Sequence, residues 1–286
     1  MTSTTLCIGD IGVSLKNVPL EQIPPELLPW IARDNEIQTV SCTSLIAPLP
    51  PLDIGDIVFD SNKTWQVHKT DAGIRILVLF GEQTRMPCQV LELNDSLTEG
   101  HATLDSRVAF DTPPPFALHT PLLELWTSFL LMRGRGLLVH GAGVLINGRV
   151  HVFVGKSGAG KSTLSNVFVD NHMGEILSDD RLIIRPSASG YRVFGTPWHG
   201  EAHLSSAASG PLAGVYFLKQ APHNQLIRAD AAFSTAAMMA TCFIAGWPRD
   251  KGLQFCLDMC AQIAASVPCN TFEFTPTVDA VHSLSL

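Results

Sequence analysis

The spacing of apolar residues changes character about a third of the way along the chain. Over residues 5–107, short runs of alternating apolar and polar residues are separated by turn residues, for example those before Gly73. Apolar residues at every second position are typical of strands with one face on a core. The pattern predicts an antiparallel β-rich domain over residues 1–110, interrupted by a proline-rich helical or irregular stretch at 20–33.

A proline-stiffened connector at residues 111–119, DTPPPFALH, leads into a region of helical spacing. Apolar residues recur at helical intervals from Leu122 to Leu130, with Pro121 at the first position and Gly134 just past the end. Proline at the start and glycine after the end are typical helix boundaries. We therefore expect a helix here, packed against the second domain, residues 111–286.

The second domain alternates strand and helix patterns. Asn147-Gly148, between two alternating runs, is a strong hairpin signal and predicts antiparallel strands at residues 144–146 and 149–154. The second arm leads into a glycine-rich turn, a helix to about Asn171 and a strand at 175–178. Further strands are predicted around residues 191–197, 212–220, 224–230 and 270–276, with helices at 231–245 and 252–266. A hairpin arm feeding such a turn predicts a mixed sheet, and the whole chain is assigned to the α/β (α+β) class.

The glycine-rich turn carries a phosphate-binding motif. Residues 155–162, GKSGAGKS, match G-x-x-x-x-G-K-[ST] throughout. In such a loop, backbone N–H groups and the following helix N-terminus meet phosphate charge, the lysine reaches the β- and γ-phosphates, and the hydroxyl takes a position on Mg²⁺. The alternative is a glycine-rich connecting turn. The predicted nucleotide-binding residues are Gly155, Lys156, Ser157, Gly158, Ala159, Gly160, Lys161, Ser162 and Thr163.

Two acids follow the motif closely, at Asp179 and Asp180. A magnesium ion held by one hydroxyl needs a carboxylate opposite it, normally from the end of a neighbouring strand. The strand predicted at 175–178 is the first that can return beside the loop. Adjacent acids also permit one to hold the ion and the other to accept a proton from an attacking hydroxyl. A solvated Asp-Asp turn is the alternative.

The composition and net charge limit the kinds of partner that we expect for this protein. The net charge is −7, and no segment clusters lysine and arginine, which argues against nucleic acid. The first ten residues lack a signal-peptide pattern, and no run reaches the roughly 18 apolar residues of a membrane span, so we expect a cytoplasmic protein without a membrane partner. Seven irregularly spaced cysteines fit reduced thiols. Cys256 and Cys260, one helical turn apart, fit core packing better than a metal site.

These motifs resemble a known family. GKSGAGKSTLS, followed by ILSDDRL and preceded by LLVHGAGV, resembles the C-terminal domain of HPr kinase/phosphorylase and the wider HPr kinase-like group. The nucleotide loop is also similar to that of phosphoenolpyruvate carboxykinases. The resemblance covers roughly residues 137–286 and implies a P-loop kinase domain that transfers a phosphoryl group from ATP, with Mg²⁺, to a serine-type hydroxyl. Hexamers are known in this family, so a homo-oligomer is implied as well.

The resemblance also implies roles for individual residues. Asp179 would accept the proton, Asp180 with Ser162 would hold magnesium, Lys161 would contact phosphate, and His140 matches the family's active-site histidine. From the residues alone, a strand histidine is more often a structural or surface group. The family's glycine-rich signature after the acids is not found here, so phosphorylase activity is left open.

A turn further along bears a possible acceptor pocket. GTPWHGE, at residues 195–201, resembles the corresponding stretch of stand-alone HPr kinase-like proteins, some of which phosphorylate a serine of a small peptide under maturation. Trp198, His199 and Glu201 could line a pocket for a protein or peptide acceptor, or Trp198 could close the core. The alternative function is a nucleotide-responsive binding or regulatory module without phosphoryl transfer. Guanine-binding and transporter-ATPase motifs are not present in the sequence.

Overall fold

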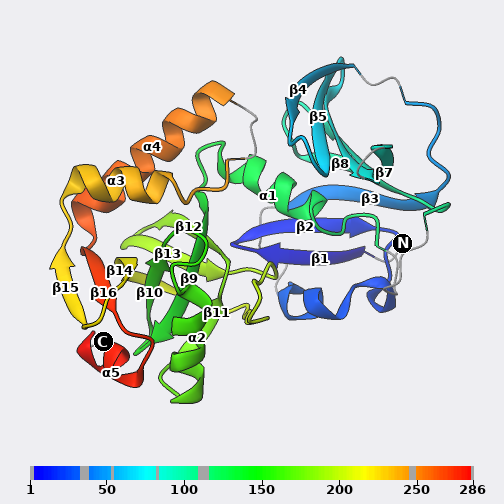
Figure 1. Cartoon of the computed structure of the whole chain (residues 1–286). Helices are drawn as coiled ribbons and strands as arrows, with labels where there is room; N and C mark the ends of the chain where they lie inside the picture. Colours follow the sequence, from blue (N-terminus) through cyan, green and yellow to red (C-terminus); the bar gives the residue numbers. More distant parts are fainter. Residues whose placement is uncertain are drawn as a thin grey trace. The chain divides into compact units, whose positions relative to one another are not determined.

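The computed structural model describes residues 3–32, 39–52, 55–81, 84–108, 116–244 and 249–284, without the side chains of residues 249 and 250 (Figure 1). The chain divides into two compact units. One comprises Met1–Leu130 with Ala245–Trp247, and the other comprises Leu131–Ile244 with Pro248–Leu286. The domain boundary expected at residue 110 and the prolines of the connector lie outside the described residues.

The first unit contains a sheet of eight strands in the order β1-β2-β3-β8-β7-β6-β5-β4. The proline-rich stretch forms two short 3-10 helices, Leu20–Gln22 and Pro25–Trp30. The strands are β1 (Ser3–Ile8), β2 (Ile11–Lys16), β3 (Thr39–Ala47), β4 (Asp56–Asp60), β5 (Trp65–Thr70), β6 (Gly73–Phe80), β7 (Met86–Asn94) and β8 (Glu99–Asp105).

The expectation of an antiparallel sheet is wrong at one strand. Strand β3 runs parallel to both of its neighbours, β2 and β8, whereas the other pairs are antiparallel. A long connection over residues 17–38 returns the chain in the same direction as β2, which a short hairpin turn cannot do. Alternation does not reveal this, because side chains have a period of two in both kinds of sheet.

Helix α1 (Leu122–Leu131) belongs, up to Leu130, to the first unit. The indole Nε1 of Trp126 donates a hydrogen bond of 3.0 Å to the carbonyl of Leu97, in the turn between β7 and β8. A methyl group at Gly100 of β8 would lie 3.2 Å from the Trp126 ring. Helical periodicity predicts the apolar stripe of this helix correctly, but it does not say which side of the chain covers the stripe.

The second unit holds eight strands and four helices among its described residues (Figure 1). The first half of the unit comprises β9 (Leu137–Ile146), β10 (Arg149–Val154), α2 (Lys161–Asp170), β11 (Glu175–Ser178), β12 (Arg181–Ser187) and β13 (Gly190–Gly195). The second half comprises β14 (Ser209–Gln220), β15 (Gln225–Arg228), α3 (Ala231–Met239), α4 (Arg249–Ser266), β16 (Cys269–Phe274) and α5 (Val278–Ser283).

The sheet of this unit is mixed, as predicted. Its order is β10-β9-β12-β13-β14-β16-β15, with β11 also on β9, and β10 additionally pairs in parallel with β14. The Asn147-Gly148 hairpin joins β9 and β10 in antiparallel register from Ile146↔Arg149 to Gly141↔Val154. The expectation that the strand at 175–178 lies next to the loop-bearing strand is wrong, because β9 and β14 occupy the two sides of β10 and β11 pairs with β9.

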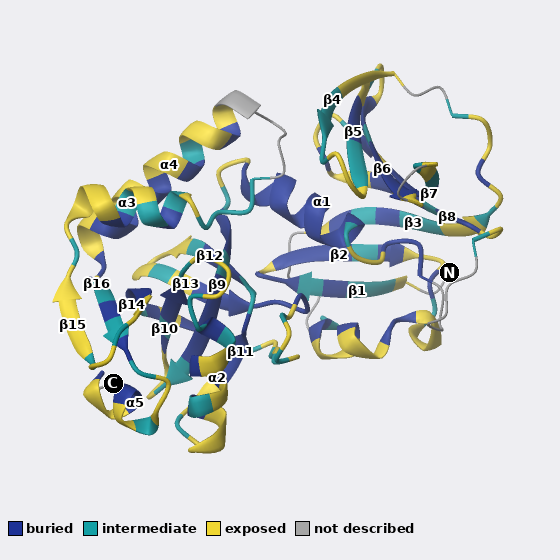
Figure 2. Ribbon diagram, viewed as in Figure 1, coloured by how far each residue is buried: buried dark blue, intermediate teal, exposed yellow. Residues whose placement is uncertain are grey.

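The two faces of this sheet are covered by different helices (Figure 2). Val152 of β10 belongs to a core cluster with Ile263 of α4, whereas the next residue, Phe153, belongs to a cluster with Phe168 of α2 and Ala280 of α5. Successive side chains of a strand point to opposite faces, so one strand supplies both cores. The phosphate-loop helix α2 is thereby fixed to one face of the sheet.

Helix α3 is shorter than the helix predicted at 231–245. It ends at Met239, and the chain then runs antiparallel to the first half of β9. The amide of His140 donates to the Thr241 carbonyl at 2.7 Å, and the amide of Phe243 donates to the Leu138 carbonyl at 2.7 Å. Backbone pairing with β9 therefore ends the helix although the apolar pattern continues.

The cysteines of this unit lie in its core. Cys256 and Cys260 are buried among apolar residues, and the sulfur of Cys260 lies 3.7 Å from that of Cys242. Burial raises the pKa of the Cys256 thiol to about 12, so the thiol stays protonated. Among the described residues, no group of three His, Cys, Asp or Glu side chains is arranged to hold a metal. The cysteines act as small apolar side chains.

Candidate functional site

The phosphate-loop motif forms a tight turn between β10 and α2. Gly158 and Gly160 have φ of +78° and +99°, values that favour glycine. A Cβ at Gly160 would lie 2.8 Å from Cζ of Phe274, and a Cβ at Gly155 would lie 2.7 Å from that of Ala159. No side chain caps the N-terminus of α2. The N–H groups of its first turn are therefore left to bind solvent or an anion.

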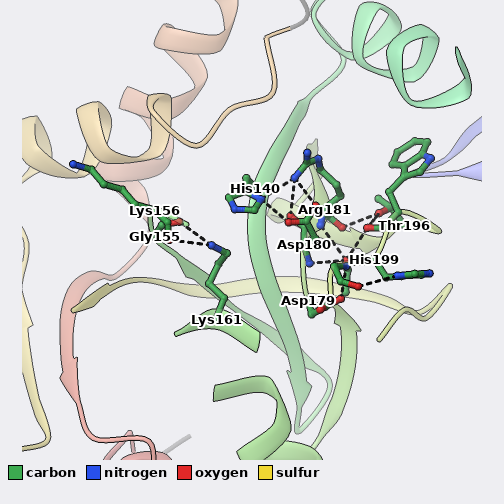
Figure 3. A network of polar contacts seen from close by, with 12 residues as sticks. His140, Gly155, Lys156, Lys161, Asp179, Asp180, Arg181, Thr196 and His199 are labelled. Atoms are coloured by element: carbon green, nitrogen blue, oxygen red, sulfur yellow. Dashed lines mark hydrogen bonds and ion pairs between the residues drawn. The ribbon is translucent and has the colours of Figure 1, made fainter. Parts of the chain in front are cut away.

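The motif lysine closes over this loop. The Lys161 side chain is buried, and its Nζ donates hydrogen bonds to the carbonyls of Gly155 at 2.9 Å and Lys156 at 3.3 Å (Figure 3). Burial lowers the pKa of Lys161, and the negative charge of Asp180 opposes this shift. The side chain of Lys156 itself is exposed.

The two adjacent acids have separate surroundings. They form the bend that connects β11 to β12. The carboxylate of Asp179 accepts the backbone N–H of Gly200 at 2.7 Å and that of Ala202 at 2.9 Å. Asp180 instead faces His140 and Arg181 (Figure 3). Only the second acid is directed towards the phosphate-loop side.

His140, Asp180 and Arg181 form a compact charged cluster. The distances are 2.7 Å from His140 Nδ1 to Asp180 Oδ1 and 2.6 Å from the Arg181 guanidinium to Asp180 Oδ2. Burial would raise the pKa of Asp180, but the hydrogen bond from His140 and the charges of Arg181, His140 and Lys161 outweigh it, and the pKa is lowered. The carboxylate is therefore ionised at neutral pH.

One ring nitrogen in this cluster has two competing neighbours. His140 Nδ1 lies 2.7 Å from Asp180 Oδ1 and also 2.7 Å from an Arg181 guanidinium nitrogen, which is always a donor. In one tautomer Nδ1 donates to Asp180, and in the other it accepts from Arg181. The first tautomer leaves the lone pair on Nε2, as a proton acceptor requires. The tautomer of the His140 ring thus depends on whether Nδ1 bonds to Asp180 or to Arg181.

Two residues that the sequence patterns did not reveal, Ser178 and Thr196, shape the bend that contains the two acids. The Ser178 hydroxyl accepts the N–H of Asp180 at 3.1 Å and of Arg181 at 3.0 Å, and it donates to the Trp198 carbonyl at 3.3 Å. The Thr196 hydroxyl donates to the Arg181 carbonyl at 2.8 Å. A serine directly before an Asp pair was the available signal, because serine side chains commonly close such turns.

The turn at residues 195–201 is anchored by Asp179. A methyl group at Gly200 would lie 2.8 Å from Asp179 Oδ2, so glycine is required for this close approach. Trp198 is buried at 7% exposure, whereas His199 and Glu201 are exposed. Trp198 therefore belongs to the core, and the other two side chains are presented on a held loop.

A pocket of about 890 Å³ opens next to the phosphate loop. Its walls come from His140, the first half of the loop at residues 155–159, the end of β14, and the helix α3. None of the residues that line it comes from the predicted acceptor set of Trp198, His199 and Glu201. Its remaining lining residues are Val154, Phe217, Leu218, Gln220, Phe233, Ala236, Ala237, Ala240 and Thr241.

The donor set near the loop suits magnesium. Mg²⁺ prefers oxygen ligands and commonly takes only one or two from the protein, with water and phosphate supplying the rest. Ser162 supplies a hydroxyl at the start of α2, and Asp180 supplies an ionised carboxylate whose charge reaches the neighbouring Lys161. These two residues are the ones that could hold the ion.

Two further basic residues of the second unit have partners away from this cluster. Lys219 pairs with Glu273 at 2.6 Å, and Arg192 donates to Ser209 at 3.0 Å. The Arg249 side chain lies outside the described residues. Arg181 is the basic residue that the fold brings into the cluster.

Comparison with known proteins does not assign this chain to a family: no protein-family model matches it, and no curated protein matches it. In the part of the chain that the structure describes, no helix is both long enough and apolar enough to span a bilayer.

Proposed function

We propose that this protein is an ATP- and Mg²⁺-dependent kinase that phosphorylates a serine-type hydroxyl of a protein or small peptide. The observation that carries the proposal is the 2.7 Å contact between Asp180 and His140, a residue that lines the pocket beside the phosphate loop. A phosphate-binding loop, a carboxylate for a metal and an acid–base group thus occur together. The motif resemblance to HPr kinase-like proteins supports the same class.

Each residue of the site then has a separate role in the proposed reaction. Backbone N–H groups of residues 155–163 and the Lys161 amine would bind the phosphates of ATP, and Ser162 and Asp180 would hold magnesium. When bound, the ion neutralises charge on the phosphates. The cation of Arg181 next to Asp180 would stabilise negative charge on the transferred group.

The structure favours His140 over Asp179 as the proton acceptor. Both oxygens of Asp179 already accept backbone N–H groups of the turn at 195–201, so this carboxylate holds that turn in place. His140 lines the pocket beside the loop, and Asp180 orients its ring through Nδ1. An imidazole fixed by a carboxylate is a common general base, because the partner sets its tautomer.

Transfer to serine peptides tests the proposal. The full chain is incubated with ATP, magnesium and a library of serine-containing peptides, and phosphopeptides are identified by mass spectrometry. Lys161→Ala should abolish phosphopeptide formation, whereas Lys251→Ala, a change at an exposed lysine of α4 outside the pocket, should preserve most of it. Tight ATP binding without any phosphopeptide would instead favour a nucleotide-responsive binding module.

A further inference from the structure

Helix α3 presents an uncharged, partly exposed surface beside the candidate site. Its sequence, AAFSTAAMM, contains no charged residue, yet Phe233 is 49% exposed. The Phe233 ring meets Phe217 edge to face, with centroids 5.3 Å apart, so it is held in place by a buried aromatic. A helix that is apolar on all sides is normally covered. The exposed side of α3 therefore indicates an apolar ligand.

The pocket next to this surface reaches the reacting groups. It extends from Phe233 and the alanines of α3 to His140, the proposed proton acceptor. Its wall includes residues 155–159 of the phosphate loop, and no lining residue comes from α2. A ligand in this pocket would therefore contact the histidine that receives the hydroxyl proton. This position is the one an acceptor, not the far end of ATP, must occupy.

Two polar side chains of the pocket wall are engaged within the protein. The Thr241 hydroxyl donates to the Met238 carbonyl at 2.7 Å, and the Gln220 amide donates to the Gly158 carbonyl at 3.0 Å. The wall formed by β14 and α3 is otherwise phenylalanine, leucine and alanine, whereas the polar side chains of His140, Lys156 and Ser157 lie on the side of the reacting groups. A purine base needs hydrogen-bonding partners at its edge, whereas an apolar side chain needs none.

An exposed strand edge leads into the same helix. Strand β15 ends the sheet order, all of its residues are exposed, and Leu226 and Ile227 are 37% and 42% exposed (Figure 2). The chain passes from β15 to α3 through residues 229 and 230. An open strand edge can bind an extended chain by backbone hydrogen bonds, with alternate side chains entering pockets. The partner is then a peptide segment, not a small alcohol.

We propose that the pocket between the phosphate loop and α3 binds an apolar side chain next to the hydroxyl-bearing residue of an acceptor peptide. This inference rests on the proposed kinase function and defines its acceptor: a serine flanked by a large apolar residue, preferably aromatic. Burial of one such side chain is worth about a tenfold gain in affinity or more.

The test uses two synthetic peptides that differ only in whether phenylalanine or alanine flanks a single serine. Their binding to the full chain is measured by fluorescence anisotropy with magnesium and a non-hydrolysable ATP analogue, and ATP affinity is measured by calorimetry. Wild type should bind the phenylalanine peptide about tenfold more tightly. Ala236→Phe, which fills the pocket from an exposed position, should remove this preference while the ATP dissociation constant changes less than about twofold.

A second variant and a control keep the result interpretable. Phe233→Ala removes one wall and should reduce the same preference, whereas Leu257→Ala, at a leucine of α4 that is 42% exposed and outside the pocket, should not. Weaker ATP binding in Ala236→Phe with unchanged peptide binding would overturn the inference and assign the pocket to the nucleoside. Equal binding of both peptides to wild type would overturn it as well.

Phosphopeptide formation in parallel samples that contain ATP in place of the analogue separates this inference from the kinase proposal. Peptide preference without phosphorylation contradicts the kinase and leaves the pocket assigned. Phosphorylation without preference contradicts the pocket alone.

Discussion

The imidazole of His140, on β9, and the carboxylate of Asp180, in the bend before β12, are in direct contact, with 2.7 Å between Nδ1 and Oδ1. Backbone pairing explains the contact. Arg181, the residue after the aspartate, is the register partner of His140 in the β9–β12 ladder, and the amide of Gly141 donates to the Asp180 carbonyl at 2.9 Å. The pair is therefore fixed by the sheet and does not depend on a flexible loop.

The two adjacent acids should respond differently to the same substitution. Asp180→Asn should lower kcat at least about a hundredfold, because it removes the charge that orients His140 and faces Lys161. Asp179→Asn should instead lower the free energy of unfolding by about 2 kcal/mol, because an amide cannot accept both backbone N–H groups of the turn. Steady-state kinetics and urea unfolding of both variants measure the difference. Equal loss of kcat without loss of stability in Asp179→Asn would return the proton-acceptor role to that residue.

Replacing the proposed proton acceptor should slow turnover without weakening nucleotide binding. His140→Gln should lower kcat by about a hundredfold or more, because an amide cannot accept the hydroxyl proton, with ATP affinity retained. Steady-state kinetics and calorimetry with ATP measure the two effects. An unchanged kcat in the variant would mean that another group accepts the proton.

Glycine should be needed at one loop position more than at another. Gly160→Ala places a Cβ 2.8 Å from Phe274 Cζ at a φ of +99°, so it should weaken ATP binding and cost more than the about 1–2 kcal/mol of a left-handed residue alone. Gly158→Ala, with φ of +78° and nothing within 4 Å of the added Cβ, should cost only the backbone term. Thermal unfolding and calorimetry with ATP compare the two variants. Equal effects would mean that the contact with Phe274 has no consequence.

Lowering the pH should destabilise the second unit, because a partly buried histidine, His151, has a lowered pKa. Burial and the charge of Arg149 lower the pKa of His151 from 6.5 to about 4, which favours the neutral ring in the folded protein. Between these two values the unfolded chain binds more protons, so stability is complete above pH 6.5, falls as the pH drops towards 4, and levels off below. His151→Gln should flatten this part of the stability curve, as measured by urea unfolding at several pH values. His282→Gln, at an exposed histidine of α5, is the control, and a wild-type slope in His151→Gln would contradict the assignment.

Local signals in the sequence predicted much of the second unit. The Asn147-Gly148 turn, the glycine loop, the helix after it and the strand at 175–178 all depend on residues close together in the chain, and all are present. The pairing of β11 with β9 was not predictable in the same way. It depends on which sides of β10 are already occupied by β9 and β14, a property of the assembled sheet.

The sequence indicated which residue types the candidate site contains, but not which way each side chain points. Sequence identified His140, Lys161 and both acids, and the resemblance assigned the first acid to proton transfer. The bend at residues 179 and 180 decides instead which acid contacts His140, and the backbone N–H groups of Gly200 and Ala202 engage the other. The contribution of Phe233 was not visible, because the apolar pattern shows neither that α3 ends at Met239 nor which of its faces stays exposed.

That early end gives the pocket a measurable connection to the acid–base histidine. Because the chain beyond α3 is hydrogen-bonded to β9, the amide hydrogen of His140 is protected by the Thr241 carbonyl. A molecule that steadies α3 should reduce the opening of this pairing and slow deuterium uptake at His140. Hydrogen exchange at the His140 amide would then report whether a ligand occupies the surface of α3.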